Sequence, residues 1–321
     1  MPKTSSSRTL RTSLTGLVAG ATLLALTAAL TACSSAAPAN PDDAPNDDRP
    51  LVLTTFTVIA DIASEVAGDH LRVESITKVG AEIHGYEPTP RDLAAASDAD
   101  LILDNGLGLE AWFSQFVETV DAPHVVVSEG VEVIDITEDA YAGKPNPHAW
   151  MSPLSVIEYT DTIAAAFSEL DPANAADFEA NAAAYQQELL TVHDELVTAL
   201  EAIPASQRAL VTCEGAFSYL ARDAGLTEQF LWAVNAEQQA TPQQIARPIE
   251  FVRDNNVAAV FCESTVSDAA MQQVVEATDA EFGGILYVDS LSESDGPVPT
   301  YLELIRYDTA LILDALVGAS S

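Results

Sequence analysis

The sequence predicts an α/β protein of two lobes, each a parallel sheet covered by helices, joined by one long rigid helix. From residue 51 onward, short apolar runs alternate with amphipathic stretches, a pattern typical of parallel sheets covered by helices. The alternation is interrupted at residues 172–203, a segment rich in Ala, Glu, Gln and Leu with no Gly or Pro after Pro172. This interruption separates an N-terminal lobe, 51–171, from a C-terminal lobe, 204–321.

Each lobe is expected to contain four strands. In the first lobe we expect strands at 51–55, 73–79, 101–104 and 125–127, and helices at 57–67, 90–97 and 109–120. In the second we expect strands at 208–213, 229–234, 257–262 and 284–288, and helices at 216–224, 242–254, 268–277 and 299–316. Ligands of such sheets collect where strands end and loops begin, so the interlobe cleft is the place to look for chemistry.

The segment 172–203 predicts a linking helix. Its apolar residues recur at spacings of three and four and form a single stripe of Phe178, Ala182, Tyr185, Leu189, Val192, Leu196 and Leu200. Asp171 is a suitable cap and Pro172 a suitable first helical residue. A helix of about 30 residues is roughly 45 Å long, enough to connect two lobes. An ordinary long surface helix fits the same pattern.

The N-terminus indicates export and lipid anchoring. Three basic residues precede an apolar stretch at 13–30, as in a signal peptide spanning 1–32. A membrane-spanning helix is the alternative, but Leu30 to Cys33 resembles a bacterial lipobox, which favours cleavage before Cys33 and attachment of lipid to its thiol. Residues 33–50, rich in Pro, Ala, Ser and Asp, then form a flexible acidic tether.

The charge of the chain restricts its partners. The 321 residues are 48% hydrophobic and carry a net charge of -36, and removal of residues 1–32 leaves 289 residues with a net charge of -39. The apolar content excludes a disordered chain. The negative charge repels phosphate backbones and disfavours nucleic acid, so cations are the natural partners. A diffuse acidic surface also serves solubility and by itself identifies no ligand.

Two of the five histidines lie in loops fixed by Gly or Pro. His84 follows a strand, and His148 stands in a Pro-flanked loop ahead of a helix. Such loops can direct an imidazole into a cleft as a metal ligand, although a surface histidine held by local hydrogen bonds is the alternative. Surface or capping roles are enough to explain the other three histidines, His70, His124 and His193.

Two carboxylates stand at strand ends of the second lobe. Glu214 ends the strand 209–213, and Asp289 ends the strand 285–288. Each could cap a following helix or turn. Together with His84 and His148 they offer two imidazoles and two carboxylates, which neutralise a divalent cation and suit Mn, Fe or Zn. Calcium prefers six to eight oxygens and is disfavoured.

Five segments together resemble the solute-binding lipoproteins of bacterial manganese/zinc ABC importers. These are HGYEPTPRD at 84–92, NPHAWMSP at 146–153, CEGAFSYLARDAGL at 213–226, WAVNAEQQATPQQIARPIEFVRDNNVAAVFCESTVSDAAM at 232–271 and YVDSLSE at 287–293. The resemblance implies two lobes bridged by a helix, with a metal between them. Its ligands would be His84, His148, a glutamate of the manganese-type members at Glu214, and Asp289.

Three departures from the family pattern bear on the metal. The first motif, usually DPH, here reads Glu82-Ile83-His84, which changes how the loop positions the imidazole. Cys213, beside Glu214, offers a soft donor that favours zinc. The His-rich acidic loop of zinc-specific members is absent, since residues 131–145 contain no histidine. On balance these features favour manganese or ferrous iron over zinc.

Two cysteines remain after the lipobox, Cys213 and Cys262, in a chain that faces an oxidising exterior, so a disulfide is possible. Alternatively, each cysteine is a free thiol that packs as a small buried hydrophobic residue. If the second lobe has the strand order that the resemblance implies, the two cysteines lie on neighbouring strands and we hypothesise that they are bonded. Glu263 and Ser264, at the end of the same strand, are then candidates to orient a ligand.

The expected function is that of a monomeric receptor without enzymatic activity. Lipid-anchored on the extracytoplasmic side of the cell membrane, it would bind Mn, or alternatively Zn or Fe, and deliver it to the permease and ATPase of an ABC importer. A metallohydrolase is the first alternative, but it needs an open coordination position and a placed general base, and the sequence contains no HExxH or Gly-x-Ser-x-Gly motif. A surface adhesin is the second alternative.

Overall fold

The computed structural model describes residues 47–113, 120–234 and 240–318. The signal peptide, Cys33 and most of the tether expected from the sequence lie outside these residues. Asp48–Ser321 forms one compact unit. Within the described residues, none of the helices has the length and apolar character needed to cross a bilayer.

The N-terminal lobe is built on a parallel four-stranded sheet in the order β2-β1-β3-β4. Its strands are β1 (Leu51–Thr54), β2 (Arg72–Ser75), β3 (Leu101–Asp104) and β4 (His124–Val126), and its helices are α1 (Thr57–Ala67), α2 (Pro90–Asp98) and α4 (Pro153–Leu170). Strand β2 ends four residues earlier than predicted, since Gly80, with φ of 77°, already belongs to the turn that leads to His84. Of the expected helix 109–120, residues 111–113 are helical and 114–119 lie outside the described residues.

The long helix α5 (Ala175–Glu201) buries all seven residues of the predicted apolar stripe. Its predicted start at Pro172 is wrong by three residues. Asp171 already ends α4 as its C-terminal cap, and its carboxylate accepts a hydrogen bond from the side chain of Asn174, the residue that precedes α5. The two helices are therefore joined by a tight turn at 171–174.

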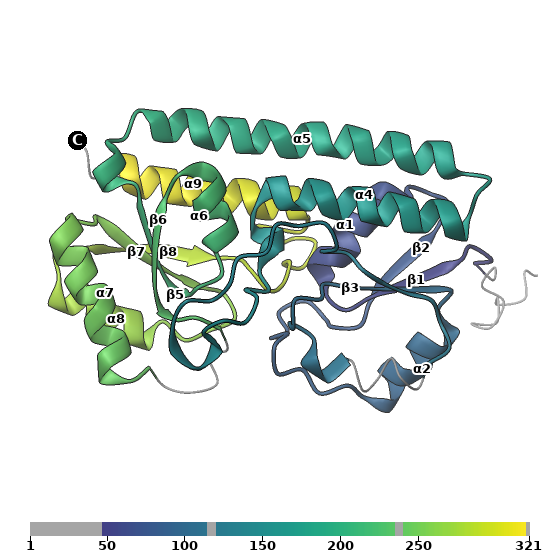
Figure 1. Cartoon of the computed structure of the whole chain (residues 1–321), viewed down its shortest axis with the longest axis horizontal. Helices are drawn as coiled ribbons and strands as arrows, with labels where there is room; N and C mark the ends of the chain where they lie inside the picture. Colours follow the sequence, from purple (N-terminus) through teal and green to yellow (C-terminus); the bar gives the residue numbers. More distant parts are fainter. Residues whose placement is uncertain (1–46, 114–119, 235–239, 319–321) are drawn as a thin grey trace, which may run out of the picture. The chain divides into compact units, whose positions relative to one another are not determined.

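Helix α5 connects the two lobes (Figure 1). It packs against α1 and α4 on one side of the molecule and against α6 (Ser218–Ala224) and α9 (Tyr301–Gly318) on the other. One hydrophobic cluster accordingly contains residues of both lobes and of α5. The lobes thus share a core, and the loops between them are held on a common scaffold.

The C-terminal lobe consists of two parallel strand pairs. Strand β5 (Ala209–Glu214) pairs with β6 (Thr227–Trp232), and β7 (Ala259–Glu263) pairs with β8 (Glu281–Leu286), while α7 (Pro242–Asn255) and α8 (Ala269–Ala277) cover them. Strands β6 and β8 begin two and three residues earlier than predicted, because polar residues at their starts also pair with the neighbouring strand. Strands β5 and β7 adjoin: Cys213 and Cys262 form a disulfide, with Cα atoms 4.8 Å apart.

Candidate metal centre

His84 lies in the loop between β2 and α2, and its backbone is fixed by a neighbouring acid. The carboxylate of Glu82 accepts hydrogen bonds from the backbone N–H of His84 at 2.7 Å and of Gly85 at 2.9 Å. The indole N–H of Trp112 donates to the carbonyl of Ile83 at 3.0 Å. The side chain of His84 is 4% exposed, so the loop presents its imidazole to the protein interior.

His148 precedes the short 3-10 helix Ala149–Met151 and is completely buried. The side-chain oxygen of Asn146 lies 2.9 Å from Nδ1 of His148, while the amide nitrogen of Asn146 donates to Gly215 and Ser218. This orientation of Asn146 places the proton on Nδ1 and leaves Nε2 of His148 as a lone-pair donor. Burial lowers the pKa of His148 well below 6.5, and the nearby His84 adds to the decrease. The ring is therefore neutral and ready to bind a cation.

Glu214 and Asp289 reach the same region from the second lobe. Glu214 ends β5 and is 1% exposed, and its backbone N–H donates to Oε2 of Glu263 at 3.1 Å. Asp289 follows β8 and is 1% exposed, and its Oδ2 accepts a hydrogen bond from the hydroxyl of Thr265 at 2.8 Å. Burial is the largest cause that raises the pKa of Asp289, and the same cause raises the pKa of Glu263 to about 8.

The donor atoms of three predicted ligands converge. Nε2 of His84 lies 3.1 Å from Nε2 of His148 and 3.5 Å from Oε1 of Glu214, and the same oxygen lies 3.9 Å from Nε2 of His148. Two donors bound to one ion at about 2.1 Å are at most about 4.2 Å apart. All three separations are below this limit, so the three donors can bind a single ion without a change of backbone.

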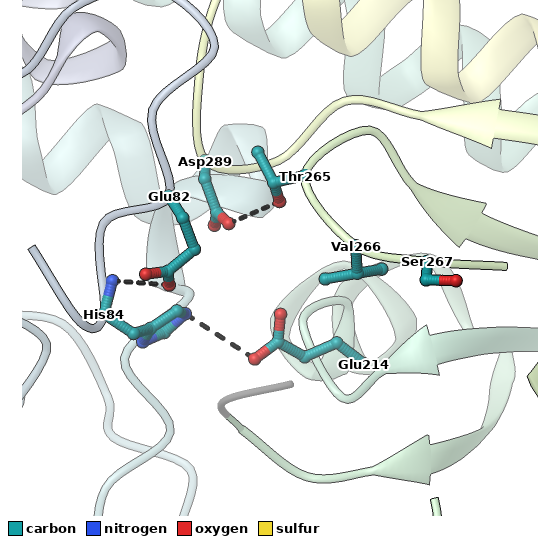
Figure 2. Close-up of a pocket in the computed structure, with 7 residues that line it drawn as sticks. All are labelled: Glu82, His84, Glu214, Thr265, Val266, Ser267 and Asp289. Atoms are coloured by element: carbon teal, nitrogen blue, oxygen red, sulfur yellow. Dashed lines mark hydrogen bonds and ion pairs between the residues drawn. The ribbon is translucent and has the colours of Figure 1, made fainter. Parts of the chain in front are cut away.

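Asp289 lies beside this group in a small cavity of about 200 Å³. Figure 2 shows the side chains of Glu82, His84, Glu214 and Asp289 directed towards the same space. The cavity is lined by Glu82, His84, Glu214, Thr265, Val266, Ser267 and Asp289. Oδ1 of Asp289 has no hydrogen-bond partner among the described residues. A buried carboxylate oxygen without a partner is costly, and a cation would satisfy it.

The other residues singled out from the sequence lie outside this group of converging donors. Glu263 contacts the backbone of Glu214 as described, whereas Ser264 is exposed and the hydroxyl that reaches Asp289 belongs to Thr265. Cys213 is bonded to Cys262 and therefore offers no thiolate, which removes the feature that favoured zinc. His70 pairs with Asp177 and His124 with Asp104, while His193 lies on α5.

Three residues of the site were not predicted as such. Asn146 fixes the proton position of His148, Thr265 holds Asp289, and Glu82 holds the His84 loop. The motif Asn-Pro-His contained a signal, since an Asn two residues before a histidine can bond to its ring. Thr265 acts through a contact between two loops, whereas Glu82 bonds to residues two and three positions later in its own loop.

Fold and site together define a class: a two-lobed binding protein with a small donor-lined cavity between its lobes. The chain belongs to the ZnuA family, described as the periplasmic component A of a zinc-uptake complex, whose family model matches residues 52–315. The iron-binding protein YfeA of Yersinia pestis is 51% identical over 268 residues, which are 83% of this chain and 86% of the relative.

Two further similarities extend the comparison. The manganese ABC transporter substrate-binding lipoprotein PsaA of Streptococcus mitis is 34% identical over 295 residues, with 89% of this chain and 94% of the relative covered. The solved structure of a Mn-bound periplasmic metal-binding protein from Candidatus Liberibacter asiaticus aligns with a TM-score of 0.79 at 37% identity, covering 84% of this chain and all of that one. These relatives are binding and transport proteins, and the chain is accordingly not an enzyme.

Proposed function

We propose that this protein is the substrate-binding component of a metal ABC transporter that binds one divalent transition metal through His84, His148, Glu214 and Asp289. The mutual distances of 3.1, 3.5 and 3.9 Å among the donor atoms of the first three ligands are the observation that carries the proposal. Asp289 supplies the second carboxylate from the wall of the same cavity. Two carboxylates neutralise the ion, and the two imidazoles favour a transition metal over calcium.

Manganese is the proposed cargo. The ligand set contains no thiolate, since Cys213 is bonded to Cys262, and its two carboxylates suit Mn²⁺. The affinity of nitrogen and oxygen sites for Mn²⁺ is nevertheless intrinsically below that for Fe²⁺ or Zn²⁺. Selectivity would therefore depend on ligand geometry and on which metal is available outside the cell.

Ferrous iron is the second candidate, because the relative of 51% identity is named an iron-binding protein. The same donor set satisfies Fe²⁺, which differs little from Mn²⁺ in ligand preference. A hydrolytic function needs an open coordination position and a general base. Four protein ligands around one ion favour storage and transfer of the ion over catalysis.

The proposed location is the extracytoplasmic side of the cell membrane, with lipid at Cys33 and the acidic segment 33–50 as a tether. The partners are the permease and ATPase of the importer, and the protein acts as a monomer. Labelling with a radioactive fatty acid tests the anchor: Cys33→Ala should abolish incorporation.

Elemental analysis tests the metal assignment. Protein purified without added metal should contain close to one equivalent of manganese or iron, and competition between Mn²⁺, Fe²⁺ and Zn²⁺ under anaerobic conditions ranks their affinities. His84→Ala or Asp289→Ala should lose the metal and keep the fold, since each removes a donor from the cavity and nothing from the core. Retention of one equivalent by both variants would refute the ligand assignment.

A further inference from the structure

The cavity contains two overlapping sets of donors. The inner ligand set is His84, His148 and Glu214, and the outer ligand set is Glu82, His84 and Asp289. Within each set, one donor atom from every residue lies within 4.8 Å of the other two. His84 belongs to both sets, and Asp289 of the outer set is also the fourth ligand of the proposed site, so a cation could move inward without losing either residue.

We propose that Glu82 is an outer ligand that captures a hydrated divalent cation at the mouth of the cavity, before the ion moves to the inner set. The inference rests on the proposed function and adds a fifth residue to the metal path. In this proposal Glu82, an acid of the loop that carries His84, increases the rate of metal uptake.

Glu82 is exposed, yet its carboxylate is held in one place. Its two oxygens accept the backbone N–H groups of His84 and Gly85 at 2.7 and 2.9 Å. Each carboxylate oxygen has two lone pairs, so both oxygens can still contact a cation. The same bonds fix the negative charge at a constant distance from the imidazole of His84.

Asp289, already proposed as a ligand, has a carboxylate oxygen within 4.8 Å of the carboxylate of Glu82. It is 1% exposed and lines the cavity, and its Oδ1 has no hydrogen-bond partner within the described part of the chain. Its other oxygen is taken by Thr265. In Figure 2, the carboxylates of Asp289 and Glu82 face the same space beside the His84 ring. A cation between them would give the free oxygen a partner.

Apart from Asp289, which is 1% exposed, the donors are ordered by burial from solvent to interior. Glu82 is exposed, the side chain of His84 is 4% exposed, and Glu214 and His148 are buried in the inner set. An ion at the outer set can keep part of its water shell, whereas the inner set replaces water by protein donors. The fixed carboxylate of Glu82 at the mouth also raises the local cation concentration, which increases the association rate.

The test compares Glu82→Gln with Glu87→Gln in stopped-flow measurements of Mn²⁺ binding. Glutamine keeps one side-chain oxygen, which can accept one of the two backbone N–H groups, and it removes the charge and the anionic metal ligand. Glu87 is an exposed acid of the same loop and does not line the cavity, so it controls for the change in net charge. Glu82→Gln should slow association about tenfold, whereas Glu87→Gln should leave it within about twofold of wild type. Glu82→Asp, which keeps the charge, should restore most of the rate.

An association rate of Glu82→Gln equal to that of Glu87→Gln overturns the proposal, whatever the change in dissociation rate. The thermal midpoint of each metal-free variant shows whether the loop substitution disturbs the fold. If Glu82→Gln is unfolded, the comparison of Glu82→Asp with wild type decides: the proposal requires similar association rates. A wild-type protein that binds no Mn²⁺, Fe²⁺ or Zn²⁺ refutes the proposed function itself, which keeps the two failures distinct.

Discussion

The side-chain oxygen of Asn146 contacts His148 twice, at 3.0 Å from its backbone N–H and at 2.9 Å from its ring Nδ1. The contacts fix both the position of the residue and the nitrogen that carries the proton. Asn146 also donates to the backbone of Gly215, next to Glu214. One amide thus joins segments of the two lobes that carry proposed ligands.

Replacement of Asn146 should weaken metal binding although the residue touches no metal. Asn146→Ala frees the ring of His148 to rotate and to change tautomer, and loss of such a partner typically costs 10–100-fold in affinity. Asn146→Asp keeps the acceptor and should retain more affinity than Asn146→Ala. Competition with a fluorescent chelator measures both. Asn255→Ala, which removes a bond within α7, is the control, and equal affinity of Asn146→Ala and this control would contradict the role.

Metal affinity should fall as the pH decreases from 7.5 to 5.5. Binding requires unprotonated imidazoles and carboxylates. Burial raises the pKa of Asp289 above 3.8, so protons compete with the metal for this ligand at a higher pH than for an exposed aspartate. Isothermal titration in buffers of different ionisation enthalpy should show proton release on binding at pH 6. A pH-independent affinity over this range counts against imidazole and carboxylate ligation.

Metal-free protein should lose stability as the pH rises, because of a buried acid in the first lobe. Burial is the main cause that raises the pKa of Glu110 from 4.5 to about 8, and the nearby Asp104 adds to the increase. The folded state therefore holds a proton that the unfolded state releases. The stabilisation is complete below pH 4.5 and is lost as the pH rises towards 8, by up to about 1.4 kcal/mol per pH unit.

Glu110→Gln tests this dependence, since glutamine stays neutral. Urea unfolding of the metal-free variant between pH 5.5 and 8 should show a smaller slope of unfolding free energy against pH than wild type. The carboxylate accepts hydrogen bonds from Thr55 and from the backbone of Asn105 and Gly106, so the substitution also changes the absolute stability. Only the slope tests whether Glu110 holds the proton in the folded state. A slope equal to that of wild type would show that it does not. Glu169→Gln, at an exposed position of α4, is the control.

The disulfide should be detectable and stabilising. Thiol titration of the unreduced protein in denaturant should find neither Cys213 nor Cys262 free, and two free thiols from these residues would disprove the bond. The bond spans 49 residues of chain, and closure of a loop of this length contributes about 4 kcal/mol in the chain-entropy treatment. Cys213→Ser with Cys262→Ser should therefore unfold at a lower urea concentration.

Periodicity predicted the positions of most elements, because the apolar pattern records burial. Leu189 and its partners on the α5 stripe are buried as predicted. The predicted ends of helices and strands were less accurate where polar residues form the backbone hydrogen bonds of the element. Glu281 begins β8 because its main chain pairs with that of Ala259 in β7. Asp171 is the C-terminal cap of α4 and does not cap α5.

The convergence of His84, His148 and Glu214 was predicted mainly from resemblance. His84 and His148 are separated by 64 residues, and nothing local in the sequence measures the distance between their rings. Contacts that orient a ligand, such as Thr265 on Asp289, depend on how two loops meet. Thr265 contacts Asp289 and Ser264 does not, because the side chain of Thr265 lies on the side of the strand end that faces the cavity.

Anomalous diffraction from crystals grown with Mn²⁺ locates the bound ion and so tests the four proposed ligands together. We expect one manganese peak within bonding distance of Nε2 of His84, Nε2 of His148, a carboxylate oxygen of Glu214 and a carboxylate oxygen of Asp289. A peak bound elsewhere, with these four side chains left without metal, would contradict it.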